Sequence, residues 1–401
     1  MQLKRLQELG KLFFQLGAIS FGGPAAHTAL MESEVVQRRQ WLTSDEFLDL
    51  LGATNLIPGP NSTEMAIHIG YRHAGWLGLI VAGTSFIFPA AVITGICAWI
   101  YVNYGTLPQV TPLLYGIKPA VLAIILHAIW RLGKKAIKTS KLLIIALAVS
   151  TLAILSNLNE VIILLLGGLG GMIWLQTTDR QLPPKQLNLI ISWITFNTTQ
   201  LTATLIPPVA TTEVIPVSLW QLGLFFLKVG SVLFGGGYLL IAFIETGLVQ
   251  EYGWLTQQQL LDAIAIGQLT PGPILSTATF IGYVIAKTPG AIVATLGIFL
   301  PSFLFVLALN PILPLLRASQ WTGAFLDAVN VSAVALMTIV TLQLGHAILI
   351  VPTAPYVDRF AVLITLVSAI LALKFQVSSV WLVFLGAICG WGYFGWVNML
   401  S

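Results

Sequence analysis

The chain is dominated by long apolar stretches that contain no charged residue. Asp, Glu, Lys and Arg are absent from residues 73–117, 288–316, 328–357 and 375–401. A membrane-spanning helix needs about 20 mostly apolar residues, so each stretch predicts one membrane helix or a pair of them. Segments are expected near residues 12–30, 45–70, 75–102, 110–131, 141–157 and 160–176, and again later in the chain. The pattern predicts an all-α, polytopic bundle of transmembrane helices.

The segments occur twice because the chain contains an internal repeat. Phe21-Gly22-Gly23 and Pro58-Gly59-Pro60 recur as Phe234-Gly235-Gly236 and Pro271-Gly272-Pro273, both 213 residues later. Farther along the separation is 212, as in Ile69-Gly70-Tyr71 and Ile281-Gly282-Tyr283. A register kept over roughly a hundred residues indicates two homologous halves. We assign the halves to residues 1–177 and 217–401, joined by a linker at 178–216.

The charges of the loops indicate that the two halves have inverted topology. The first-half loop 131–141 has five Lys or Arg residues, whereas its counterpart at 343–353 has none. Two further loops reverse the bias, because Arg317 and Lys374 stand where the first half has no cation. Cytoplasmic loops are enriched in Lys and Arg, so equivalent loops should lie on opposite sides of the membrane. Arg38 and Arg39 oppose this assignment unless the first two segments are re-entrant.

Inversion requires an odd number of crossings between equivalent points of the two halves. Residues 187–206 of the linker carry no charge and are the candidate for an additional transmembrane helix, giving about thirteen crossings. The N-terminal apolar run leads into a motif rather than into a small-residue cleavage site, so it is not a cleavable signal. We expect a multi-pass protein of the cell inner (plasma) membrane with a cytoplasmic N-terminus.

The composition argues against several functional classes. Hydrophobic residues make up 57 % and charged residues 8 % of the chain, whereas soluble domains carry roughly 25 % charged residues. Cys97 and Cys389 are isolated in apolar segments, so we expect no disulfide framework, metal site or cofactor. No nucleotide-binding loop, dinucleotide fingerprint or nucleophile motif is present in the sequence. We expect neither an enzyme nor a nucleic-acid-binding protein, and transport driven by ion gradients or the membrane potential.

Two kinds of helix break occur in both halves and form the candidate substrate site. Transporters with inverted repeats bind substrate near the bilayer midplane, between broken helices whose N-termini point at the anion. Each N-terminus offers free N–H groups and roughly half a positive charge. The alternative is that these motifs are tight turns or notches for helix packing. The candidate binding residues are Ser20, Gly22, Gly23 and Pro24 with Gly235, Gly236 and Gly237 at the first break, and Asn55, Pro58, Gly59, Pro60 and Asn61 with Gln268, Thr270, Pro271, Gly272 and Pro273 at the second.

Two cations, Lys118 and Lys228, lie inside apolar segments. A charge at mid-membrane costs at least about 2.5–3.5 kcal/mol, so such a residue is a functional candidate by default. If both lysines face one cavity, the site holds two positive charges, which suits a dianion. The alternative is that each lysine extends to the membrane interface.

Further polar residues are repeat partners. Glu32 and Glu245 follow the first break by about two helical turns. They are candidates for proton coupling, with a structural ion pair to Arg38, Arg39 or a lysine as the alternative. Thr43 begins the sequence Thr-Ser-Asp-Glu, which is typical of a helix N-cap with an acidic first turn, and Thr256 is its partner.

Several stretches resemble the chromate ion transporter family. They are FFQLGAISFGGPAAH, QRRQWLTSDEFLDLLGATNLIPGPNSTEMAIHIGYRHAGWLG and YGIKPAVLAII in the first half, and FFLKVGSVLFGGGYLLIAFIE with YGWLTQQQLLDAIAIGQLTPGPILSTATFIGY in the second. The whole length is similar to a long-chain, two-domain member. The resemblance implies a bacterial plasma-membrane protein that exports chromate and confers chromate resistance. The residues that match the family's motifs are Phe21, Gly22, Gly23, Pro24, Trp41, Pro58, Gly59, Pro60, Lys118, Pro119, Lys228, Gly235, Gly236, Gly237, Pro271, Gly272 and Pro273.

The expected mechanism is alternating access, with a dianion such as chromate bound between the paired breaks. An inside-negative potential contributes about 2.3 kcal/mol per charge per 100 mV, so a dianion gains about 4.6 kcal/mol on leaving and export needs no proton coupling. A general transporter of sulfate-like oxyanions is the alternative, since chromate and sulfate share their charge and shape. A membrane-embedded enzyme or reductase and a structural subunit are less favoured. The expected partners are the oxyanion and the lipid bilayer, and a homodimer is left open.

Overall fold

The computed structural model describes residues 2–21, 24–105, 107, 110–156, 158–179, 217–234, 237–309, 319–350 and 357–400. These residues form helices joined by turns, with one isolated β-bridge between Ile350 and Val357. The predicted all-α class is confirmed. The additional helix predicted at 187–206 and the linker 178–216 fall almost entirely outside the described residues.

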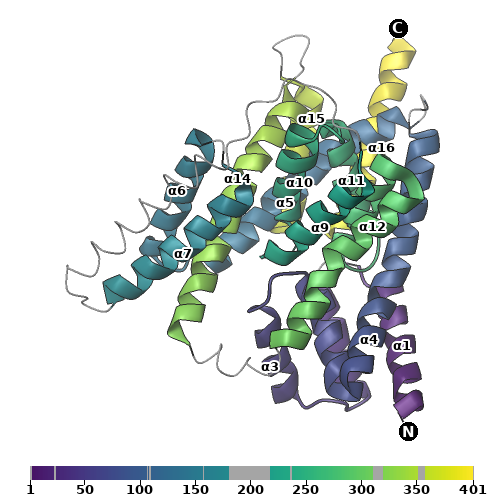
Figure 1. Cartoon of the computed structure of the whole chain (residues 1–401). Coiled ribbons are helices and arrows are strands. Elements are labelled where there is room, and N and C mark those ends of the chain that lie inside the picture. The colour runs from purple at the N-terminus through teal and green to yellow at the C-terminus, as the bar shows by residue number, and fades with distance from the viewer. Residues whose placement is uncertain are drawn as a thin grey trace.

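The helices of the first half recur in the same order in the second half (Figure 1). The first half contains α1 (Gln2–Ile19), α2 (Pro24–Glu32), the π-helical turn η1 (Ser33–Arg38), α3 (Ser44–Thr54), α4 (Asn61–Tyr104), α5 (Thr111–Ala136), α6 (Ser140–Leu155) and α7 (Glu160–Asp179). The second half contains α9 (Leu219–Val232), α10 (Leu240–Ile244), η2 (Glu245–Glu251), α11 (Gln257–Leu269), η3 (Ile274–Ser276), α12 (Thr277–Leu309), α14 (Gln320–Leu349), α15 (Arg359–Lys374) and α16 (Ser379–Leu400).

The helix starts after the π-helical turns follow from local sequence. The Thr43 hydroxyl accepts from the Glu46 amide, and the Glu46 carboxylate accepts from the Thr43 amide at 3.0 Å. Thr256 and Gln259 form the same reciprocal pair in the second half. Two otherwise unsatisfied N–H groups gain partners in each pair, which fixes where α3 and α11 begin. The predicted N-caps are confirmed.

Long helices α4 and α12 are each kinked at the equivalent position. Ala74 and Gly75 leave helical geometry in α4, as do Ala286 and Lys287 in α12. Gly70, before the α4 kink, lies against the backbone of Gly78, after the kink. Residues eight apart in a straight helix are separated by about 12 Å, so this contact means that the chain reverses direction at the kink. The boundary expected between segments 45–70 and 75–102 is therefore present as a helical hairpin.

Five helices of the described part are long and apolar enough to cross a membrane. They are Asn61–Tyr104, Thr111–Ala136, Glu160–Thr177, Ile274–Leu309 and Gln320–Leu349. Three shorter apolar helices cover Ser140–Leu155, Leu219–Val232 and Ser379–Gly395. This content agrees with a multi-pass membrane protein.

The equivalent helices α5 and α14 are neighbours that run in opposite directions. Gly133 of α5 lies beside Val334 of α14, whereas Leu122 lies beside Gly345. Residue numbers thus rise along one helix as they fall along the other. Helices related by the repeat can pack antiparallel in this way when a two-fold pseudo-axis lies between them. The two halves are therefore inverted relative to each other, as the loop charges indicated.

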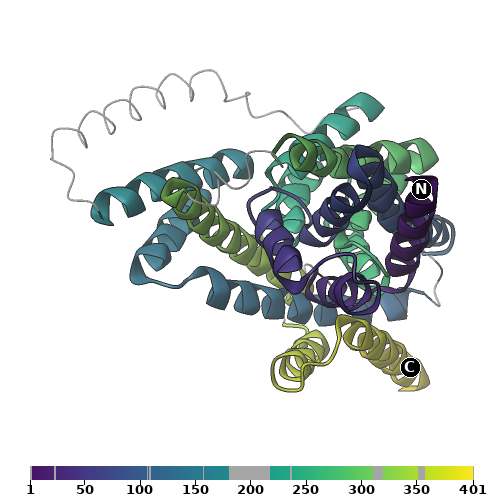
Figure 2. The same cartoon turned by 90° about the horizontal axis from the view of Figure 1, so that it is seen from below.

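Each half places its last two helices against the other half. Helices α6 and α7 pack on α14, while α15 and α16 pack on α5. The two hairpins project from different sides of the bundle, coloured blue-green and yellow in Figure 2. Gly116 of α5 crosses α16 at Gly386 and Gly390 so closely that any Cβ atom there would meet backbone. We call α6–α7 and α15–α16 the exchanged hairpins, because each packs against the other half. Lipid supplies no hydrophobic force between helices, so close contacts between small residues stabilise this packing.

The antiparallel contact predicts a specific disulfide. In a background with Cys97→Ala and Cys389→Ala, the pair Gly133→Cys and Val334→Cys should cross-link, because a Cβ at Gly133 lies 3.8 Å from the Val334 side chain. Electrophoresis after mild oxidation and cleavage in the 178–216 linker measures the product. Gly133→Cys with Gly345→Cys is the control, since those α14 positions are about 16 Å apart. Equal cross-linking of both pairs would contradict the antiparallel arrangement.

Candidate functional site

The helix breaks of the two halves meet and bond to each other. The Gly59 amide donates to the Leu233 carbonyl at 2.7 Å, and the Gly272 amide donates to the Ser20 carbonyl at 2.8 Å. Gly59 and Gly272 are repeat partners, and so are Ser20 and Leu233. The Pro-Gly-Pro loop of each half therefore caps the first break of the other half.

Glycine is required in both loops for steric reasons. Gly59 has φ +144°, and a Cβ atom there would overlap the Glu64 carboxylate and crowd the Ser302 hydroxyl. Gly272 has φ +86°, and its Cβ would lie 2.6 Å from the Cβ of Ala90. Residues other than glycine rarely adopt such φ values. The loops can approach the opposite half only because they lack side chains.

Buried polar side chains from both halves surround the crossed loops. His27 Nε2 lies 3.2 Å from the Ser20 carbonyl, and the Ser20 hydroxyl has no hydrogen-bond partner in the described part of the chain. The Thr94 hydroxyl donates to Ser276 at 3.2 Å, joining the two halves. Buried polar groups are usually hydrogen-bonded, so the unmatched Ser20 hydroxyl makes this region a candidate for a ligand site.

The other predicted break residues have the following places. Pro24 begins α2, Pro60 precedes α4, and Pro273 precedes η3, while Gly237 has φ +92°. Asn61 donates to the Asn55 side chain at 3.0 Å, and the Thr270 hydroxyl donates to a carbonyl of its own helix. Gln268 contacts the Tyr238 hydroxyl. Gly22, Gly23, Gly235 and Gly236 lie outside the described residues, and Pro58 and Pro271 are part of the loops described above.

Lys118 is paired with a carboxylate of the other half. Its ammonium nitrogen is 3.8 Å from Asp262 Oδ1, and the Tyr101 hydroxyl donates to Asp262 Oδ2 at 2.8 Å. Asp262 is fully buried, while the Lys118 side chain is 17 % exposed. The cation is therefore partly accessible, and a ligand anion would compete with Asp262 for it.

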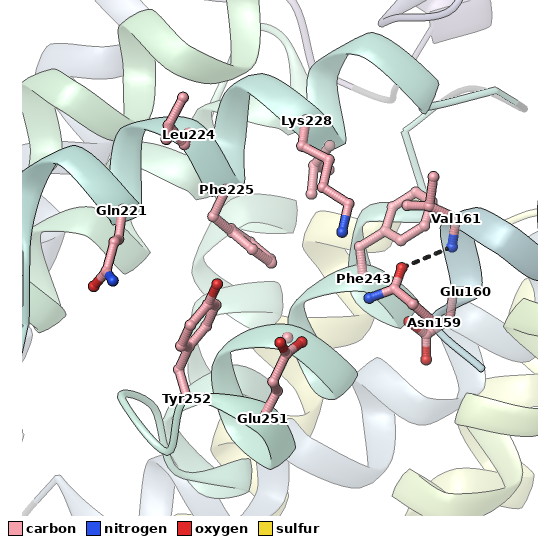
Figure 3. A pocket seen from close by; sticks show the side chains of 12 residues that line it. Asn159, Glu160, Val161, Gln221, Leu224, Phe225, Lys228, Phe243, Glu251 and Tyr252 are labelled. Atoms are coloured by element: carbon pink, nitrogen blue, oxygen red, sulfur yellow. Dashed lines mark hydrogen bonds between the residues drawn. The ribbon is translucent and has the colours of Figure 1, made fainter. Parts of the chain in front are cut away.

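Lys228 lies in a different environment (Figure 3). It lines a pocket of about 160 Å³ between α9, η2 and the start of α7, together with Glu160 and Glu251. Lys118 is not among the residues that line this pocket. One cation with two carboxylates gives a surrounding that is unfavourable for a dianion. The pocket at Lys228 therefore does not include Lys118, and Lys118 faces one carboxylate where Lys228 has two nearby.

The two candidate coupling carboxylates differ in burial. Glu245 is 3 % exposed, and its Oε1 accepts from Gln250 at 3.4 Å. Glu32, at the end of α2, is half-buried. Arg38 and Arg39 form ion pairs with Glu34, at 3.0 and 3.2 Å. Neither arginine pair therefore involves Glu32.

A model of the family described as "Chromate transporter" matches residues 7–172 and 220–391, which is most of both halves. The chain belongs to the chromate transporter family. The probable chromate transport protein of Synechococcus elongatus is 33 % identical over 85 % of this chain and 85 % of its own length. The chromate transport proteins of Cupriavidus metallidurans and Pseudomonas aeruginosa are 32 % and 29 % identical over 95 % and 94 % of this chain, and over 91 % and 90 % of their own lengths. No solved structure matches this transporter.

Three residues of this transporter's candidate site were not singled out from the sequence. Glu64 follows the first Pro-Gly-Pro loop, Asp262 pairs with Lys118, and Ser302 reaches the Gly59 loop from α12. A signal existed for the two acids, because any ionisable residue within an apolar membrane segment is a functional candidate. Ser302 carried no signal, since serine is common in membrane helices.

The Lys118–Asp262 contact predicts a stability pattern. Lys118→Ala should lower the free energy of unfolding by about 3 kcal/mol, because it leaves a buried carboxylate unpaired. Lys118→Ala with Asp262→Asn should recover most of this loss. Thermal unfolding of the purified transporter measures both. Lys138→Ala is the matched control: its pair with Asp327 is exposed, so the cost should stay below about 1 kcal/mol. Equal losses for the two lysines would refute a specific role for the buried pair.

Proposed function

We propose that this transporter exports chromate across the cell membrane and thereby confers chromate resistance. The proposal is supported by membership of the chromate transporter family and by relatives named chromate transport proteins along nearly the whole chain. Chromate is a tetrahedral dianion, so its site must supply positive charge and hydrogen-bond donors. An inside-negative potential favours its exit by about 4.6 kcal/mol per 100 mV.

The crossed loops are the observation on which the proposed site depends. They bring breaks from both halves together, so that helix N-termini and buried hydroxyl groups of opposite halves surround one region. Backbone N–H groups at helix N-termini can bind anions although they carry no formal charge. Lys118 supplies the point charge in this proposal. The dianion is held between the paired breaks, where movement of either half changes its surroundings.

Alternating access is supported by a difference between equivalent elements. Leu261 of α11 is 4 % exposed, whereas its repeat partner Leu48 of α3 is 59 % exposed. Helix α11 packs against α5 and α16, while the main contacts of α3 are with α4. Two inverted halves in unequal conformations can exchange those conformations, which opens the site alternately to the two sides. In the exchanged state α3 packs on α14 and α11 is released.

Hydrogen exchange tests this exchange of conformations. In the wild type, amides of α3 should exchange faster than those of α11. Asp262→Asn removes the pair that holds α11, so α11 should lose protection while α3 gains it, and the ratio of the two protections should change roughly tenfold for a shift of about 1.4 kcal/mol. Mass spectrometry of peptides covering 44–54 and 257–269 gives both rates. Loss of protection in α11 without a gain in α3 would indicate local unfolding instead.

Uptake of labelled chromate into everted vesicles tests the transport function. Wild-type vesicles should accumulate chromate when their interior is positive, and accumulation should stop when the potential is dissipated while the pH gradient is kept. The variant with both Lys118→Ala and Asp262→Asn should lose at least about tenfold in rate despite its recovered stability, because the substrate charge partner is gone. Lys228→Ala should lose less than about threefold.

Controls in the same vesicles separate the rival functions. Equal inhibition by excess sulfate would indicate a general oxyanion transporter. Full activity of the Lys118 and Asp262 double variant would leave those residues with a structural role only. Accumulation that survives dissipation of the potential would contradict electrically driven export.

A further inference from the structure

Glu64 is a carboxyl group at the crossed loops that the transport mechanism above does not use. It lies in the first turn of α4 and is 0 % exposed. The separation between the halves changes from 213 to 212 between residues 60 and 69, so the counterpart of Glu64 in the second half is Ser276 or Thr277. The carboxyl group therefore breaks the two-fold similarity of the site at one position.

The contacts of Glu64 come from both halves. Its Oε1 lies against Cα of Gly59 in the Pro-Gly-Pro loop of its own half, and the Ser302 hydroxyl of α12 faces the same point. Neither carboxylate oxygen makes a hydrogen bond of standard geometry among the described residues, and neither does the Ser302 hydroxyl. A carboxyl group that is fully buried with one hydroxyl group beside it is costly to keep charged. Such a position is occupied most easily by a carboxyl group that can take up a proton.

Other ionisable groups lie on α4 itself and on the elements packed against it. His68 follows one turn later on α4, and His27 of α2 faces the Ser20 carbonyl. The charged groups on the elements packed against α4 are Lys4, Arg5, Glu8 and Lys11 on α1, Glu32 on α2, Asp45, Glu46 and Asp49 on α3, Asp262 on α11 and Lys287 on α12. Glu46 pairs with Arg72 and Asp262 with Lys118, while Lys4, Arg5, Lys11 and Lys287 are exposed. Among the described residues, no Lys or Arg forms a salt bridge with Glu64.

We propose that Glu64 is a proton-binding site coupled to the anion site, so that an oxyanion dianion binds at the Gly59 loop together with one proton on Glu64. This proposal rests on the function proposed above. A dianion and an ionised Glu64 would both use the N-terminus of α4, and they repel each other. A neutral Glu64 removes that repulsion. Because linkage between two sites is reciprocal, the anion increases the affinity of Glu64 for a proton by the same factor as the proton increases the affinity for the anion.

The proposal changes the charge that crosses the membrane. A dianion accompanied by one proton carries a net charge of −1, instead of −2 for the dianion alone. Export remains favoured by an inside-negative potential, but the dependence on potential is halved. The counterpart, Ser276 or Thr277, does not ionise, so the proton site belongs to the first half alone.

Calorimetric titration of the purified full-length transporter with chromate tests the proposal between about pH 7 and pH 9, in buffers of different ionisation enthalpy. The wild type should take up close to one proton per bound chromate in the upper part of this range. Its affinity should fall about tenfold per pH unit there, as expected for one linked proton. Glu64→Gln should bind chromate with no proton uptake and with nearly constant affinity. Glu8→Gln on α1 is the matched control and should behave as the wild type.

The outcomes separate this proposal from the transport function. Wild-type binding without proton uptake would overturn the proton site and leave chromate transport intact. The same would follow if Glu64→Gln kept the wild-type pH dependence, or if Glu245→Gln abolished proton uptake instead. Absence of any chromate binding or transport by the wild type would overturn the proposed function itself. If Glu64→Gln fails to fold, Glu64→Ser, which introduces a hydroxyl residue as in the second half, takes its place. The number of protons that the wild type takes up per bound chromate tests the proposal without either variant.

Discussion

The interior of a membrane offers no water to hydrogen-bond with an interrupted helix. Every break in a membrane helix therefore needs a partner from the protein itself. In this transporter the partner is the opposite half: the amides of Gly59 and Gly272 are satisfied by carbonyls of Leu233 and Ser20. This reciprocity explains why the breaks occur in both halves, and why the loops that cross contain glycine at positive φ. Neither half could bury its own breaks alone.

The same interdependence extends to the outer helices. The α6–α7 hairpin covers α14 and the α15–α16 hairpin covers α5, so each half lacks a complete surface without the other. Close glycine contacts at both crossings keep the helices at short distance. A frame is thus formed by α5, α14 and the hairpins α6–α7 and α15–α16. In the proposed mechanism, the broken segments α2, α3, α10 and α11 move relative to this frame.

Much of the architecture could be predicted from the sequence because it depends on local or periodic signals. The repeat, the breaks at Pro-Gly-Pro, the caps at Thr43 and Thr256 and the inversion all follow from spacing, residue type or loop charge. The pairing of Lys118 with Asp262 did not follow, since the two residues are in different halves and no spacing relates them. Whether Lys118 and Lys228 face one cavity could not be predicted either, because the carboxylates beside Lys228 come from distant segments of the chain. The buried environment of Glu64 depends on Ser302 and on the path of α12, which only tertiary structure supplies.

The exchanged hairpins also bear on how the protein is made. Helices α6 and α7 leave the ribosome and enter the membrane before α14, their packing partner, has been synthesised. Until then the glycine-rich face of α7 lacks α14, and the Gly59 loop has no Leu233 carbonyl to bond. Folding of the first half is therefore completed only when the second half arrives. A first half made alone would lack α14, the helix against which its α6 and α7 pack.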